Sequence, residues 1–173
     1  MIRNFANSAF AFCLLAASAA PALAHVTLEQ GEAAVGSTYR AVVRVPHGCG
    51  AEATHTLRVQ IPQGFVNVKP MPLAGWTLET VTGAYDAPVT HRDSQVTEGV
   101  REIVWSGGNL PDAWYGEFVF RGAFATELEA GSTLHFPVVQ ECANGEEAWI
   151  DTDGGEGSPA PGVKLLPAAA SAH

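Results

Sequence analysis

The feature that most limits the fold of this chain is the period of its apolar residues. No segment keeps a helical period of 3.6 residues for three turns, whereas short stretches of alternating apolar and polar residues occur throughout. Between Leu57 and Ile61 every second residue is apolar, and Pro62 ends the segment. Because several such strands are separated by glycine and proline turns, we predict an all-β sandwich.

Glycine-containing turns divide the predicted strands. Asn144-Gly145 is the strongest short hairpin signal in the chain. We expect further turns at residues 107–109, which read Gly-Gly-Asn, and at Pro111-Asp112, and a loop or an irregular hairpin in the polar residues 85–98. The predicted strands are residues 26–29, 39–45, 54–61, 65–68, 76–81, 100–106, 115–121, 133–140 and 147–152.

The first 24 residues have the order of a secretory signal peptide. Arg3 supplies a positive charge and residues 9–20 form an apolar run that is too short to span a membrane as a helix. Ala22 and Ala24 form a small-x-small site, after which signal peptidase cuts. Cleavage after Ala24 makes His25 the first residue of a periplasmic or secreted protein.

Residues 25–152 form one predicted sandwich domain with a single sizeable core. Residues 153–173 are rich in glycine, proline and alanine, so we expect a flexible tail, from which residues 163–166 could pack back. Removal of the signal leaves 8 basic and 18 acidic residues, a net charge of about −10. This acidity argues against nucleic acid and anionic membranes as partners. No second apolar stretch reaches spanning length, so stable membrane insertion of the mature chain is not expected.

Two cysteines remain after removal of the signal, which contains Cys13. In an exported chain, Cys49 and Cys142 are expected to form a disulfide. A metal site with two cysteine ligands is the alternative.

His25 is the strongest candidate metal ligand. As a first residue it offers the free α-amine and the ring Nδ1, which can close a six-membered chelate ring around one ion. Such nitrogen donors suit Cu(II). The alternative is that His25 has no metal-binding role, because cleavage must leave some residue first and a histidine can occur there by chance. The chain has two methionines, one of them the initiator, which excludes a methionine-rich Cu(I) site.

Each of the other candidate ligands can also be explained without a role in metal binding. His47, in a loop beside Cys49, is a candidate for a second metal site, whereas histidines in strands are expected to be surface or packed residues. Glu117 is either a solvated side chain on the outer sheet face or a carboxylate placed on a rigid strand. Glu52, in a loop, is its rival as a metal ligand. Trp149 lies in a late strand, where a tryptophan usually belongs to the core.

Enzyme signatures are absent from the sequence. It contains no nucleophile elbow, no phosphate-binding glycine loop and no paired-histidine zinc helix. No residue is therefore predicted to be catalytic.

An ordered set of short motifs resembles the YcnI-like family of bacterial exported copper-binding domains and covers nearly the whole mature chain. The first motif is the His-Val-Thr-Leu start at His25. The others are Val-Pro-His-Gly-Cys at 45–49, Val-Gln-Ile-Pro at 59–62, Val-Lys-Pro-Met-Pro at 68–72, Val-Trp-Ser-Gly-Gly at 104–108, Glu-Phe-Val-Phe-Arg-Gly at 117–122, Phe-Pro-Val-Val-Gln-Glu-Cys at 136–142 and Trp-Ile at 149–150.

This resemblance implies an immunoglobulin-like or fibronectin-III-like sandwich with a Cu(II) site called a single-histidine brace. In that site His25 gives both nitrogens, and a glutamate and a tryptophan complete it. The tryptophan corresponds to Trp149. Glu117 matches the family pattern better than Glu52, which remains the alternative. The family often occurs beside other copper-handling proteins, which are therefore expected partners.

The first interpretation is a periplasmic, non-enzymatic Cu(II)-binding protein, a copper chaperone or homeostasis factor. A copper-dependent oxidative enzyme is the second, although braces of that kind generally add another histidine. A metal-free secreted interaction sandwich is the third.

Overall fold

The computed structural model describes residues 25–154 and 158–168. The predicted signal peptide and the residues 155–157 and 169–173 of the predicted tail lie outside the described residues. Within the described part, no helix is present that could cross a membrane. The strands are β1 (Thr27–Leu28), β2 (Glu32–Ala34), β3 (Thr38–Val45), β4 (Thr54–Gln60), β5 (Phe65–Pro70), β6 (Thr77–His91), β7 (Ser94–Leu110), β8 (Gly116–Phe124), β9 (Thr133–His135), β10 (Val138–Glu141), β11 (Glu146–Trp149) and β12 (Gly162–Leu166).

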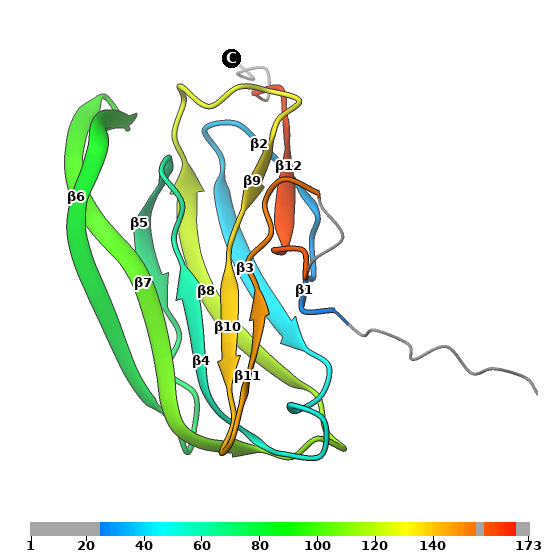
Figure 1. The fold of residues 1–173 in the computed structure, drawn as a ribbon. Helices are drawn as coiled ribbons and strands as arrows, with labels where there is room; N and C mark the ends of the chain where they lie inside the picture. Colours follow the sequence, from blue (N-terminus) through cyan, green and yellow to red (C-terminus); the bar gives the residue numbers. More distant parts are fainter. Residues whose placement is uncertain (1–24, 155–157, 169–173) are drawn as a thin grey trace, which may run out of the picture.

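Three sheets make up the fold, and the two larger ones form the layers of a sandwich (Figure 1). The four-stranded sheet has the order β1-β3-β8-β5, and the five-stranded sheet has the order β11-β10-β4-β7-β6. A small sheet, β2-β12-β9, joins early and late segments of the chain. The prediction of an all-β sandwich is confirmed.

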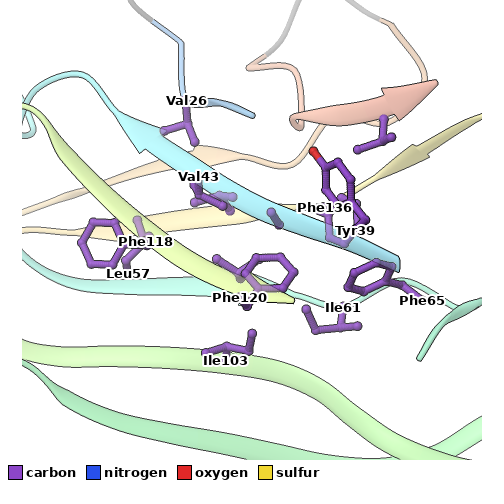
Figure 2. Packing of buried hydrophobic residues seen from close by; sticks show 14 of the residues in the cluster. Val26, Tyr39, Val43, Leu57, Ile61, Phe65, Ile103, Phe118, Phe120 and Phe136 are labelled. Carbon is purple, nitrogen blue, oxygen red and sulfur yellow. The ribbon is translucent and has the colours of Figure 1, made fainter. Parts of the chain in front are cut away.

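The core lies between the two larger sheets and is rich in aromatic rings (Figure 2). Phe65 packs against Tyr39, Phe120, Phe124 and Phe136, with ring centroids 5.1 to 6.3 Å apart. Burial of each such ring contributes roughly 1.5–3 kcal/mol. The alternation of apolar and polar residues in the sequence therefore places one face of each strand in this core.

Residues 85–98 form the distal half of the β6–β7 hairpin, which runs along the left of Figure 1 and has a register irregularity between Ala84 and Val89. The alternative of an irregular hairpin is therefore confirmed, and that of a loop is wrong. The tip of the hairpin is Arg92 and Asp93, with φ of 49° and 63°. Two successive positive φ angles match the twist of a tight hairpin. Much of β6 is exposed, so the apolar alternation that reveals half-buried strands is missing here.

The predicted turn at Pro111-Asp112 is confirmed, since the backbone N of Trp114 donates to the oxygen of Pro111 at 3.0 Å. The prediction of a turn at residues 107–109 is wrong, because these residues lie inside β7. The pairing of β4 with β7 is irregular at this point, and Gly107 has φ of 72°. A Cβ on Gly108 would lie 2.0 Å from the Trp76 ring. The glycines therefore make a bulge and admit an indole; they do not reverse the chain.

The predicted strand 133–140 is two strands, β9 and β10, which belong to different sheets. Pro137 lies between them and has no N–H to donate to a sheet. The chain therefore changes sheets at this proline.

The expectation that residues 163–166 could pack back is confirmed, so a flexible tail is wrong for residues 162–166. These residues form β12, which pairs with β2 and with β9. Val163 and Leu165 are fully buried in the main core, while Lys164 and Leu166 alternate outward. The domain thus continues to residue 166, and glycine and proline content concealed a short strand.

Candidate metal site

His25 lies at the junction of the two large sheets. It precedes β1, an edge strand of the four-stranded sheet, and contacts Trp149 at the end of β11, an edge strand of the five-stranded sheet. The ring centroids are 5.3 Å apart and the planes make an angle of 66°. Val26 is buried (Figure 2) and Thr27 pairs with Arg44, so the strand that follows fixes the place of His25.

Trp149 is both a core residue and a neighbour of His25. Its side chain is buried in the main cluster, as the ordinary reading of a late-strand tryptophan predicts. Its Nε1 has no hydrogen-bond partner among the described residues. A buried donor without a partner typically costs about 1–3 kcal/mol. The edge-on contact with His25 contributes roughly 0.5–1.5 kcal/mol in return.

Glu117 lies on the same sheet as β1 but beyond the intervening strand β3. Thr27, Arg44 and Glu117 occupy one row across the three strands, so the Cα atoms of Thr27 and Glu117 are about 10 Å apart. The Glu117 Oε1 lies 3.6 Å from Arg44 Nε and accepts a hydrogen bond from the Tyr115 hydroxyl at 3.4 Å. The carboxylate is thus on the predicted outer face, with Arg44 as its neighbour.

Glu52 anchors the loop between β3 and β4 through hydrogen bonds. Its carboxylate accepts hydrogen bonds from the backbone N of Asn144 at 2.9 Å and from Asn144 Nδ2 at 2.6 Å. These bonds hold the pKa of the Glu52 carboxyl below its usual range. The contacts tie the loop to the β10–β11 turn, where the predicted Asn144-Gly145 hairpin is confirmed.

The predicted disulfide between Cys49 and Cys142 is also confirmed, with Cα atoms 6.1 Å apart. The two cysteines are 93 residues apart in the sequence, and closing a loop of that length contributes roughly 4–5 kcal/mol in the chain-entropy model. Since both thiols are oxidised, the alternative of a two-cysteine metal site is wrong. The bridge and Glu52 together fix the loop of residues 46–53.

The rings of His47, His55 and His135 each lie within hydrogen-bond distance of a backbone carbonyl group. His55 Nδ1 lies 2.8 Å from the oxygen of Gly108, and His135 Nδ1 lies 3.1 Å from that of Ala160. His47, the candidate for a second site, lies 2.6 Å from the oxygen of Gly48. In the described part of the chain, no three side chains from His, Cys, Asp and Glu are grouped closely enough to hold a metal ion.

Sequence reasoning did not single out Gln140, which holds the loop of residues 46–53 in place through hydrogen bonds. Gln140 is almost fully buried in β10 and donates to the oxygen of His47 at 2.6 Å and to Thr54 Oγ1 at 2.8 Å. Gln140 alternates with the apolar Val138, which places it on the inner face of β10. This alternation is the sequence signal that could have identified Gln140 as a buried residue. A buried amide with partners on two segments specifies how they meet.

Comparison with known proteins agrees with this architecture. A family model described as a domain of unknown function, DUF1775, matches residues 25–165. An uncharacterized protein from Nocardia farcinica, whose crystal structure reveals an immunoglobulin-like fold, is 25% identical with a TM-score of 0.59. The match covers 82% of this chain and 98% of that one. No curated protein matches. The predicted immunoglobulin-like class of the sandwich is confirmed.

Proposed function

Because the chain belongs to the DUF1775 family over residues 25–165, we propose that it is an exported, non-enzymatic Cu(II)-binding protein that delivers or stores copper. The observation that carries the proposal is the contact of His25 with Trp149. The resemblance to YcnI-like proteins assigns these two residues to one copper site, although they lie far apart in the sequence. The ion is the cargo of the protein, and other exported copper-handling proteins are its proposed partners.

The donor atoms of His25 fit Cu(II) as a two-nitrogen anchor. After cleavage behind Ala24, the α-amine and Nδ1 belong to one residue and close a chelate ring, and nitrogen donors in a plane suit this ion. His25 is partly exposed, so an ion can reach it from solvent while Trp149 covers one side. Buried N–H groups are nearly always paired, and an acceptor that arrives with the ion is one way to satisfy Trp149 Nε1.

The carboxylate of the proposed site is Glu117 or Glu52. Glu117 is the first candidate because it is held on a rigid strand, on the sheet that β1 also joins, and a preorganised ligand loses less entropy on binding. To reach an ion at His25, Glu117 would have to release Arg44, and Glu52 would have to release Asn144.

A copper-dependent oxidative enzyme is less well supported. Braces of that kind generally add a second histidine, and His47, His55 and His135 have carbonyl partners of their own.

The test compares two forms of the processed chain. One begins at His25 with a free α-amine, and the other has that α-amine acetylated, which turns it into an amide. We expect 1:1 Cu(II) binding by the first in a calorimetric titration and at least hundredfold weaker binding by the second, because one chelate ring is lost. His47→Asn in the first form is the control and should bind copper normally. Equal affinity of the two forms would exclude the brace, and no binding by either would favour a metal-free interaction domain.

A further inference from the structure

Three cationic side chains form a row on the outer face of the four-stranded sheet. Arg40 on β3 is the register partner of Arg121 on β8, and Arg121 is the register partner of Lys69 on β5. All three side chains are exposed. Like charges directly opposite on neighbouring strands destabilise a sheet, so the fold tolerates repulsion at this row.

The row contrasts with the charge of the whole chain. Residues 25–173 hold 8 basic and 18 acidic residues. Among the ion pairs of the described residues, none includes Lys69 or Arg121. Arg40 has one exposed contact, 3.6 Å from Glu29, and such contacts contribute little. Within an acidic protein, this row therefore carries positive charge that ion pairs scarcely neutralise.

A groove of about 320 Å³ lies along the row. It is lined by the three cations and by Pro70, Met71, Pro72 and Val119. Met71 is 47% exposed, which is high for a large apolar side chain in a folded domain. We call this feature the cationic groove: an apolar floor with cations on its rim.

The walls of the cationic groove are held by hydrogen bonds. The backbone N of Met71 donates to the oxygen of Val119 at 2.8 Å. From the core side, Nε1 of the buried Trp105 donates to the oxygen of Met71 at 3.1 Å. Because the segment is fixed from both sides, a ligand would meet a groove that is already formed, and binding would require little ordering.

We propose that the cationic groove binds an acidic peptide segment of a partner protein, with one apolar side chain on the floor and flanking carboxylates at Arg40, Lys69 and Arg121. The groove volume is at the small end of ligand sites and suits one side chain rather than a whole domain. Guanidinium groups bind carboxylates with charge-assisted hydrogen bonds. The proposal does not depend on the proposed copper function.

Charge and shape favour a peptide over a membrane or a free anion. The net charge of about −10 repels an extended anionic surface, whereas a short segment contacts only the groove, because repulsion is screened beyond about 8 Å at physiological salt. A free phosphate would leave the apolar floor uncovered. Binding to an anionic membrane and binding of free phosphate are outcomes that the test distinguishes from peptide binding.

The experiment measures fluorescence anisotropy of labelled peptides with the processed protein at low salt. The probe has a central leucine between two pairs of glutamates, and the matched peptide has serine in place of the leucine. We expect the leucine peptide to bind about tenfold more tightly, from burial of its side chain. Lys69→Gln and Arg121→Gln should each weaken binding about fivefold, while Lys164→Gln, the same charge change on β12, should alter it less than twofold.

Stability is measured in parallel. Arg121→Gln should not lower the thermal unfolding temperature, because it removes like-charge repulsion, so weakened binding cannot be attributed to unfolding. Equal weakening by Lys164→Gln would overturn the proposal in favour of general electrostatic attraction. Absence of peptide binding would also overturn it. So would binding of phosphatidylglycerol vesicles or inorganic phosphate, if Arg121→Gln abolished that binding and the peptides did not compete for it.

Discussion

At the scale of the residue, Trp149 serves the core and the candidate site with one side chain. Trp149→Phe should remove most of the fluorescence quenching by Cu(II) and weaken binding by less than about tenfold, because an indole is not a strong donor. Stability should change by about 1 kcal/mol or less, since the ring still packs and an unpaired N–H is removed. Trp114→Phe, at a residue that is 65% exposed, is the control and should leave the quenching intact. Full quenching in Trp149→Phe would place copper elsewhere.

The two glutamates make a matched pair of substitutions. Whichever carboxylate binds copper, its replacement by glutamine should weaken Cu(II) binding and change the electron paramagnetic resonance spectrum, because a charged oxygen donor becomes neutral. We expect this for Glu117→Gln, whereas Glu52→Gln should leave the spectrum unchanged and weaken only the contact with Asn144. If neither spectrum changes, the proposed site contains no glutamate from this pair, and His25 remains the anchor.

The candidate site was predictable only in part. His25 follows from the cleavage site, and Trp149 from the resemblance. The contacts of the glutamates depend on strand register, which aligns Arg44 with Glu117, and on the fold of the Asn144 turn. A sequence read without its pairing does not contain that information.

At the scale of the element, β12 shows what a short strand contributes. Deletion of residues 162–173 removes the buried Val163 and Leu165, and we expect a loss of about 3–6 kcal/mol from the free energy of unfolding. Deletion of residues 169–173 alone is the control and should have little effect. Chemical denaturation of both forms measures the difference. Equal stability would mean that β12 is dispensable.

Strands with one buried face were predictable, whereas the distal half of the β6–β7 hairpin was not assigned to strands with certainty. The apolar alternation of residues 54–61 matched β4, because one face of β4 packs into the core. Residues 77–81 of β6 were predicted as a strand, whereas its distal half, in which only Tyr85 and Val89 are buried, read as a loop or an irregular hairpin. In the structure, Tyr85 and Val89 of this half pack with Val66 and Ala125 in a small cluster, and that contact depends on the tertiary fold rather than on a local pattern.

At the scale of the whole molecule, His25 and Lys69 lie near opposite edges of one sheet. His25 precedes β1 and Lys69 lies on β5, with β3 and β8 between them, a separation of roughly 15 Å. Lys69 has no ion-pair partner among the described residues, and distant positions without shared partners usually act independently. Lys69→Gln should therefore leave the Cu(II) affinity of the processed protein within about twofold of the unchanged protein, as measured by calorimetry. A larger change would show that the sites are coupled.

The parallel pairing of β2 with β12 has a consequence for the order of folding. β2 is made early in synthesis and β12 late, and their register places Glu32 beside Lys164. Neither that ladder nor the packing of Val163 and Leu165 can form until residue 166 has left the ribosome or a translocation pore. Contacts between such distant segments slow folding, and the first strands wait with unpaired edges. We therefore expect folding to finish in one late cooperative step, with the emerging chain dependent on chaperones that cover those edges.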